Sequence, residues 1–159
     1  APGHSPGHLC FYDGRRRLLL SGDHILPRIT PNISLHPQQP TNPLADFFAS
    51  LDKVAALDVD EVLPAHEYRF RGLAERVVAL RRHHERRFAD IMAALRDHPG
   101  ATAWEITVGL TWSRPWEDIP FFMQRAAVGE TLAHLVVLET RDAVQRTGAR
   151  PQHWALSGG

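Results

Sequence analysis

One long stretch, Arg71 to Asp97, constrains the fold more than any other part of the sequence. Its apolar residues recur every three or four positions, which is the period of an amphipathic helix. The positions on this face are Leu73, Val77, Leu80, His84, Phe88, Ile91 and Leu95. Within "RRHHERR" the histidine His84 falls on the apolar stripe, and the arginines beside Glu85 are expected to face solvent. The pattern predicts one long helix with a single buried face.

The sequence before this helix reads as short strands around one shorter helix. The runs "HLCFY" and "RLLLSGD" are β-type and are separated by a turn that contains Asp-Gly. A proline-rich segment follows and is expected to be an ordered loop. Asn42 is a plausible N-cap with Pro43 in the first helical position. A further strand, "DEVLPAH", completes a strand–helix–strand order, which predicts an α/β fold.

The sequence after the long helix is mainly helical. Thr102 is the expected N-cap of a short helix, with Glu105 as its capping-box partner. A second long helix is expected from about Pro120 to Gln145, and "RTGARPQHWAL" reads as part of a small hairpin. Helices followed by a terminal ribbon suggest a relative of the helix-turn-helix class. We place the boundary near residues 67–72, which gives domains 1–68 and 69–159.

Composition excludes several classes of protein. The chain is 43% hydrophobic and 23% charged, and its 18 basic and 18 acidic residues cancel. This charge balance gives no field that would attract nucleic acid or an anionic membrane. No apolar run approaches the roughly 18 residues of a membrane span. The single cysteine, Cys10, fits a reducing compartment, and we expect a cytoplasmic protein.

Three polar residues lie where predicted strands begin or end. His4 stands in a glycine turn before a strand, and Asp23 and His66 each follow one. Side chains at strand ends can converge on one edge of a sheet, and imidazole and carboxylate suit zinc. Each residue also has a simpler interpretation: His4 as a hydrogen-bonding loop residue, Asp23 as part of an ordinary Gly-Asp turn, and His66 as the cap of the next segment.

The order of these segments and their local amino-acid sequences resemble those of the metallo-β-lactamase superfamily, and in particular its glyoxalase-II-like branch. The matching strings are "APGHSPGH", "LLLSGD" and "LPAHEY", and they span about residues 1 to 68. The resemblance implies the C-terminal half of an αββα sandwich, followed by a small winged-helix-like domain. It also implies that His4 binds one metal, that Asp23 bridges two metals and is catalytic, and that His66 binds the second.

Two further histidines lie in the same segments and have expected roles of their own. His8, the second histidine of the doubled turn, is expected to support the turn by hydrogen bonding instead of binding metal. His24, next to Asp23, is a candidate for the wall of the pocket. The four tryptophans are expected to pack in the core of the second domain, and the alternative is that "TWSRPW" lines a substrate entrance.

The superfamily's main ligand motif, H-x-H-x-D-H, does not occur in this sequence. We therefore expect the chain to be the C-terminal portion of a longer enzyme with two zinc ions per active site, or iron or manganese in their place. The portion alone should bind metal poorly and be inactive, because each zinc normally takes about four ligands. Its sheet should leave an apolar face uncovered, so self-association is expected.

The resemblance implies a metal-dependent hydrolase in which a bridging hydroxide attacks an ester, a thioester or an RNA phosphodiester. The partners would be small-molecule substrates or RNA, with no membrane. Sequence-specific DNA binding is not expected, because the later helices lack a basic reading surface. The alternative is a non-catalytic winged-helix module that acts in dimerisation or nucleic-acid contact. An upstream H-x-H-x-D-H motif in the gene would favour the hydrolase.

Overall fold

The computed structural model describes residues 7–36 and 41–158, and these residues form two compact units. Unit 1 holds the described residues 7–33 and 41–83, and unit 2 holds 34–36 and 84–158. The helix α2, Leu73–Asp97, contributes its first part to unit 1 and its second part to unit 2. None of the helices in the described part of the chain is both long and apolar enough to cross a membrane.

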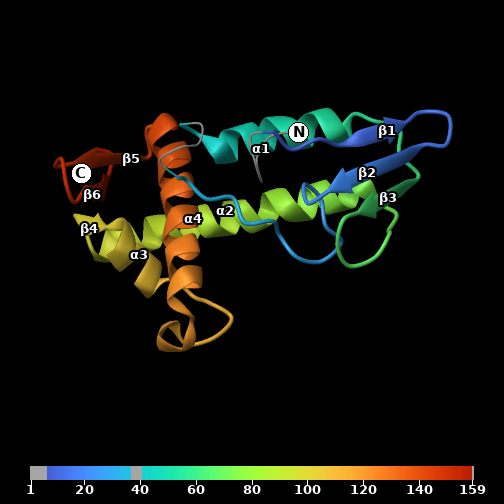
Figure 1. The fold of residues 1–159 in the computed structure, drawn as a ribbon. Coiled ribbons are helices and arrows are strands. Elements are labelled where there is room, and N and C mark those ends of the chain that lie inside the picture. The colour runs from blue at the N-terminus through green and yellow to red at the C-terminus, as the bar shows by residue number, and fades with distance from the viewer. Residues whose placement is uncertain (1–6, 37–40, 159) are drawn as a thin grey trace. The chain divides into compact units, whose positions relative to one another are not determined.

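Unit 1 contains a three-stranded sheet in the order β1-β2-β3 (Figure 1). Its strands are β1 (Phe11–Asp13), β2 (Leu18–Gly22) and β3 (Glu61–Pro64). β1 and β2 are antiparallel, whereas β2 and β3 are parallel and are connected through the helix α1, Pro43–Ala55. This arrangement confirms the mixed α/β fold that the strand–helix–strand order predicts.

Helix α1 covers one face of this sheet. The side chain of Asn42 accepts a hydrogen bond from the backbone N–H of Ala45, which confirms the expected N-cap. The apolar residues of α1 are buried together with two residues from the facing side of the sheet: Leu44, Phe47, Leu51, Val54, Leu19 and Val62. Burying a side chain of this size contributes roughly 1.5–3 kcal/mol, so this layer is the core of unit 1.

The opposite face of the sheet is apolar and open. Phe11 is paired with Leu20, and Leu20 with Leu63, so the three side chains point to the same side. Phe11 is 63% exposed and Leu20 is 45% exposed. Within the described chain, therefore, this face lacks the cover that α1 gives to the other one.

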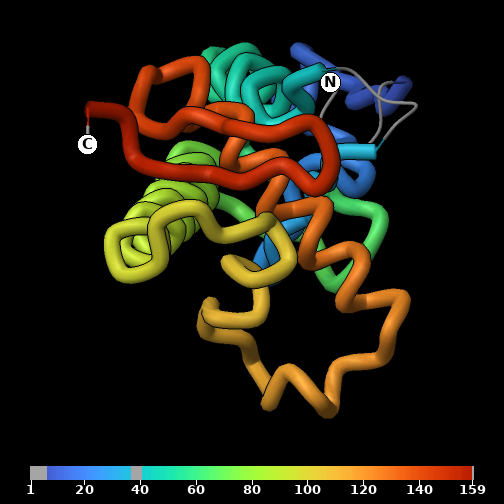
Figure 2. Tube along the Cα trace, turned by 90° about the vertical axis from the view of Figure 1, so that its left-hand side faces the viewer, coloured from blue at the N-terminus to red at the C-terminus, as the bar shows by residue number. Residues whose placement is uncertain are grey.

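Unit 2 combines three helical segments with a second sheet. After α2 come β4 (Ala101–Thr102), α3 (Ala103–Gly109), the 3₁₀ turn η1 (Trp116–Asp118) and α4 (Phe121–Thr140). The strands β5 (Val144–Thr147) and β6 (His153–Leu156) form a hairpin, and β4 pairs with β6 to give an antiparallel sheet in the order β4-β6-β5. Figure 2 shows this hairpin and the wide loop between α3 and α4.

A local sequence signal accounts for the start of α3 but not for the end of α4. Thr102 and Glu105 form the expected capping box at the start of α3. The second long helix ends at Thr140, five residues before the predicted end at Gln145. Asp142 has a positive φ of 56°, which breaks the helix, and Gln145 belongs to β5. Residues Val144 to Thr147 form a strand instead of continuing the helix because they pair with β6. The helical periodicity of the sequence does not reveal this pairing.

The predicted apolar stripe of α2 is confirmed, including its histidine. All seven of its side chains are buried: Leu73, Val77, Leu80, His84, Phe88, Ile91 and Leu95. His84 Nδ1 lies 3.0 Å from Nε2 of the buried His134, whose Nδ1 lies 2.8 Å from the backbone oxygen of Glu130. Because a carbonyl can only accept, Nδ1 of His134 carries a proton. With neutral rings, His84 therefore donates to His134.

The division into units differs from the sequence-based boundary at residues 68/69, because the first turns of α2 are bound to unit 1. Nε of Arg76 donates to the backbone oxygen of Leu26 at 2.6 Å, and its Nη2 donates to that of Ile29 at 2.7 Å. Arg81 donates to the backbone oxygen of Phe48 at 3.1 Å. These long-range bonds join residues that are distant in sequence, so composition alone does not locate them.

The tryptophans divide between core and surface. Trp154 is 1% exposed and fills the core of unit 2, as expected. Trp104 is 43% exposed, and its ring lies 5.5 Å from that of the half-buried Trp116, which lies 5.9 Å from that of Trp112. The expectation of core packing therefore holds for Trp154 and is wrong for Trp104, since the neighbouring segment forms the wide loop between α3 and α4.

Glu130 makes the stability of unit 2 depend on pH. Burial raises the pKa of this half-buried carboxyl, against the opposing charge of Arg87. Folding therefore takes up a proton above the unfolded pKa of about 4.3, and the free energy of unfolding falls as pH rises toward the folded pKa. Glu130→Gln should be more stable than the wild type at neutral pH. In urea titrations at a series of pH values, its free energy of unfolding should fall less steeply with rising pH. The exposed Glu117→Gln is the control. Equal slopes for wild type and Glu130→Gln would contradict the assignment.

Candidate functional site

The candidate site lies at one edge of the sheet of unit 1. β2 and β3 run parallel, with Gly22 opposite Pro64, so the residues that follow both strands emerge at the same edge. The backbone N–H of Ala65 donates to the oxygen of Gly22 at 3.0 Å and extends the pairing by one step. Asp23 and His66 are the next residues in the two segments, which explains how positions far apart in sequence meet.

The two side chains are in contact. His66 Nε2 lies 3.2 Å from Asp23 Oδ1, and the side chains are 69% and 33% exposed, respectively. A carboxylate and an imidazole, both reachable from solvent, are donors that zinc accepts. The structure therefore brings together two of the three residues expected at the site, and their role as metal ligands stays a prediction.

His8 holds the turn that presents Asp23. Its Nε2 accepts a hydrogen bond from the backbone N–H of Asp23 at 3.0 Å. The predicted support of the doubled turn itself falls largely on residues 1–6, outside the described residues. Because Nε2 accepts this bond, that nitrogen carries no proton and its lone pair is occupied. The bond ties the turn after β2 to the segment before β1, and so fixes the position from which the carboxylate of Asp23 extends.

Gly22 makes this close approach possible. Its φ is +55°, and a β-carbon at this position would lie 2.5 Å from His8 Nε2. Gly22→Ala should lower the free energy of unfolding by about 2–3 kcal/mol, since the left-handed backbone costs roughly 1–2 kcal/mol and the displaced hydrogen bond about 1 more. Chemical denaturation measures this effect.

Gly109→Ala is the matched control, because a β-carbon there meets no atom within 4 Å. The cost of Gly22→Ala should also shrink in a His8→Ala background, where the ring is gone. An equal cost in both backgrounds would show that the His8 contact is not its cause.

His24 belongs to the interior. Its side chain is fully buried, and its ring meets that of Phe47 edge-on at a centroid distance of 5.0 Å. The backbone N–H of His24 donates to the oxygen of Ser21, and Ser21 Oγ donates to the oxygen of Ile25, which closes the turn around it. The expectation that His24 lines a pocket wall is therefore wrong, because the apolar α1 layer covers it.

The described residues provide only part of a metal site. His4, the third expected ligand, lies outside them. Among residues 7–36 and 41–158, no group of three or more His, Cys, Asp or Glu side chains is placed to hold a metal ion. Asp23 and His66 have the right donor chemistry for zinc, but a zinc ion normally takes about four ligands. The pair therefore fits as a portion of a centre and does not complete one.

Two residues that sequence reasoning missed hold the loop beside the site. Glu67 has a positive φ of 70°, and its carboxylate accepts the backbone N–H of Arg28 at 3.1 Å. Arg76 anchors the same loop through the oxygens of Leu26 and Ile29, and burial lowers the pKa of its guanidinium. The only sequence signal was the position of Arg76, three residues after Leu73 and next to the buried stripe of α2.

Comparison with known proteins points to one superfamily. The model of the metallo-beta-lactamase superfamily matches residues 1–66. The chain is 27% identical over 115 residues to the beta-lactamase-like protein 2 homolog of Caenorhabditis elegans, which covers 72% of this chain and 36% of that protein. It is 31% identical over 94 residues to the lactamase-like protein vrtG of Penicillium aethiopicum, which covers 59% of this chain and 28% of that protein.

Two solved structures resemble nearly the whole chain. A metallo-beta-lactamase family protein from Thermus thermophilus superposes with a TM-score of 0.83 at 34% identity, over 98% of this chain and 47% of the other. A beta-lactamase domain protein from Burkholderia ambifaria gives 0.89 at 32% identity, over 99% and 46%. The chain thus spans about a third of the curated relatives and about half of the solved ones. The matches support the metallo-beta-lactamase superfamily, whose members are generally hydrolases.

Proposed function

We propose that this chain carries part of the active site of a metal-dependent hydrolase of the glyoxalase-II-like branch. The observation that supports this most strongly is the contact between Asp23 and His66 across the ends of two parallel strands. The order of "PGHSPGH", "SGD" and "PAHE" along the chain resembles that branch, and residues 1–66 match the superfamily. Zinc is the proposed metal, with iron or manganese as alternatives that the same donors accept.

In this proposal the chain's own residues bind the metal and hold the metal ligands in position. Asp23 presents a carboxylate to the metal centre, and His8 accepts a hydrogen bond from its backbone N–H, which holds the turn from which the carboxylate extends. His66 supplies an imidazole from the end of β3, and the loop 24–33 is kept in place beside them by Glu67 and Arg76. When bound, zinc lowers the pKa of a coordinated water and so makes hydroxide available at neutral pH.

The substrate is proposed to be a carboxylic ester, a thioester or an RNA phosphodiester. The test uses the protein as encoded by its gene, with one substrate of each kind, before and after removal of metal by EDTA. Hydrolysis of at least one substrate, lost with EDTA and restored by zinc, iron or manganese, is the expected result. Hydrolysis that is indifferent to EDTA, or a metal-loaded protein that cleaves none of the three, would contradict the proposal.

For unit 2 we propose a winged-helix assignment. Its support is the order of elements: a helix, a short strand, two helices and a hairpin whose sheet includes the short strand. DNA reading is not part of the proposal. The start of α4 exposes Phe121, Phe122 and Met123, and these side chains are apolar where a DNA-reading surface is basic.

We also propose that the 159-residue chain associates with itself through the open face of its first sheet. The support is the pair of exposed apolar side chains Phe11 and Leu20, which point to the same side of the sheet. Such a face costs free energy in water, and contact with a second copy would cover it. A dimer or larger assembly is therefore expected in light scattering of this chain.

Replacing Phe11 and Leu20 together by lysine should shift the 159-residue chain to the monomer. The charges would oppose burial of the face, and both positions are already exposed, so folding is expected to persist. The double variant Val78→Lys and Trp104→Lys, also at exposed apolar positions but off this sheet, is the control. A wild-type chain that is already monomeric at high concentration would contradict the proposal.

The remaining proposal is a cytoplasmic location. Its support is the single cysteine: Cys10 is a free thiol whose Sγ donates to the backbone oxygen of Ser21, and burial raises the pKa of that thiol. A half-buried, protonated thiol is stable in a reducing compartment and contributes no disulfide.

A further inference from the structure

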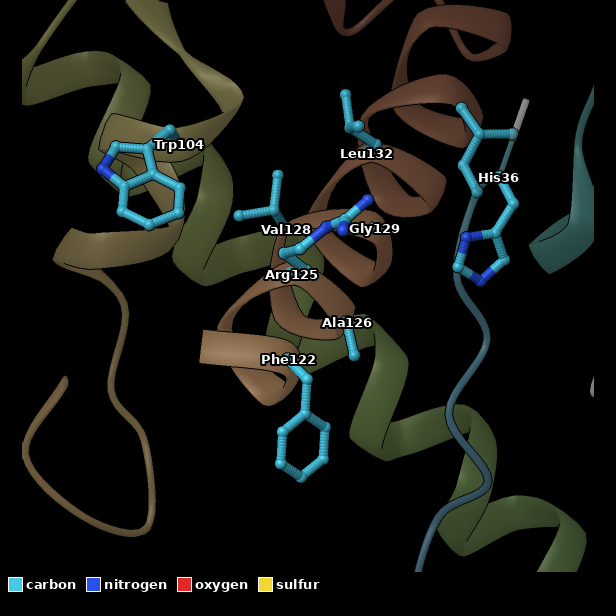
Figure 3. A pocket seen from close by; sticks show the side chains of 9 residues that line it. His36, Trp104, Phe122, Arg125, Ala126, Val128, Gly129 and Leu132 are labelled. Carbon is cyan, nitrogen blue, oxygen red and sulfur yellow. The ribbon is translucent and has the colours of Figure 1, made fainter. Parts of the chain in front are cut away.

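A hollow lies in unit 2, beside α4. Its volume is about 440 Å³, within the usual range of small-molecule sites. The residues that line it come from α4, from α3 and from the short segment 34–36: Leu35, His36, Trp104, Phe122, Arg125, Ala126, Val128, Gly129 and Leu132. Figure 3 shows Trp104 on one side of α4 and His36 on the other, with Arg125 between them.

One wall of this pocket is fixed by hydrogen bonds to the helix. The backbone N–H of Leu35 donates to the oxygen of Gly129 at 2.9 Å, and Ser34 Oγ donates to the oxygen of Ala126 at 3.1 Å. A β-carbon at Gly129 would lie 3.0 Å from Ser34 Cβ, so the glycine favours this close approach. The segment 34–36 therefore stays against α4, and the pocket is a built feature of unit 2.

The lining combines apolar side chains with one fixed positive charge. Leu35, Val128 and Leu132 are aliphatic, and Trp104 and Phe122 add aromatic faces. Arg125 takes part in none of the ion pairs formed by the described residues. The residues that line the pocket include no carboxylate. The charge of Arg125 is thus available to a ligand that brings a negative group of its own.

We propose that this pocket binds an amphiphilic organic anion, such as a medium-chain carboxylate, with its anionic group on Arg125. The apolar body would lie along Leu35, Val128 and Leu132, where it leaves water, and most of the affinity would come from this burial. The exposed guanidinium would add selectivity for the anion over a neutral analogue. A nucleic-acid strand fits less well, because it presents one phosphate per nucleotide and only Arg125 supplies a permanent positive charge here.

The test is a titration of the protein, as encoded by its gene, with octanoate and decanoate by isothermal titration calorimetry. We expect saturable binding of one carboxylate per chain and a Kd that falls about fourfold per added methylene. Arg125→Gln should weaken decanoate binding about three- to tenfold while leaving decan-1-ol unchanged. Val128→Phe should abolish binding of both by filling the pocket. Arg114→Gln, an exposed arginine of the loop before η1, is the matched control and should bind as the wild type.

Three results would overturn the proposal. The first is the absence of saturable carboxylate binding, and the second is binding that neither Arg125→Gln nor Val128→Phe weakens. The third is displacement of decanoate by an RNA oligonucleotide that is present at a lower concentration than decanoate and whose binding depends on Arg125. Binding here is independent of the proposed hydrolase site, so Asp23→Ala should not change the Kd. Failure of one proposal can therefore be distinguished from failure of the other.

Discussion

Asp23→Ala, made in the protein as encoded by its gene, is expected to lower kcat/KM for metal-dependent hydrolysis about a thousandfold. The substitution removes the carboxylate that would help to hold the metal, and metal stabilisation of a transition state contributes several kcal/mol. A loss of about 4 kcal/mol corresponds to a factor of about a thousand. Steady-state kinetics on the substrate that the wild type hydrolyses measures the effect.

Two controls separate this loss from unfolding. Asp90→Ala removes an exposed carboxylate from α2 and should leave both activity and stability unchanged. Asp23→Asn keeps the shape of the side chain and the backbone N–H that His8 accepts, so its thermal unfolding should match that of the wild type. Retained activity in Asp23→Ala would remove Asp23 from the mechanism, whatever the metal.

Trp154→Ala is expected to destabilise unit 2 by about 3–5 kcal/mol, the range for a large aromatic side chain truncated in a core. Trp154 is 1% exposed, and its neighbours in the sheet are Ala101 on β4 and Arg146 on β5. The guanidinium of Arg146 also lies 4.8 Å from its ring, and this contact would be lost. Since the side chain joins all three strands, their sheet should loosen together.

Urea unfolding followed by far-ultraviolet circular dichroism measures the change. Trp104→Ala is the matched control, because its side chain is 43% exposed and its loss should cost less than about 1 kcal/mol. If the two variants were equally stable, Trp154 would not be the centre of the core. The hairpin β5–β6 would then be a peripheral addition to the helices.

Sequence reasoning succeeded where structure depends on nearby residues. The stripe of α2, the N-cap of Asn42 and the capping box of Thr102 are all local patterns, and all three are present. The sequence assigns His8 to the doubled turn "PGHSPGH" and does not predict its bond to the backbone N–H of Asp23. A hydrogen bond to the backbone leaves no trace in the identity of the partner residue.

Prediction from the sequence fails where contacts with distant segments determine the local structure. The end of α4 depends on the pairing of Val144 to Thr147 with β6, and helical periodicity does not reveal that partner. The burial of His24 depends on Phe47, and the division of the chain within α2 depends on Arg76 and on the loop it binds. The bonds from segment 34–36 to α4 were missed for the same reason.

The candidate site illustrates both cases. Asp23 and His66 each follow a strand in the sequence, and that position suggested a shared edge before any geometry was known. Their contact at 3.2 Å requires that β2 and β3 be parallel neighbours with Gly22 opposite Pro64, which a sequence pattern does not specify. The residue types therefore indicate the chemistry of the pair, whereas its contact depends on the parallel pairing of β2 and β3 in the fold.

The most direct test of the central claim is to locate metal in crystals of the protein as encoded by its gene, using anomalous scattering at the zinc edge. The account predicts an anomalous peak adjoining the Asp23 carboxylate and the His66 imidazole, with the zinc content per chain reduced in both Asp23→Ala and His66→Ala. Full zinc content in both variants, or a peak remote from these side chains, would contradict it.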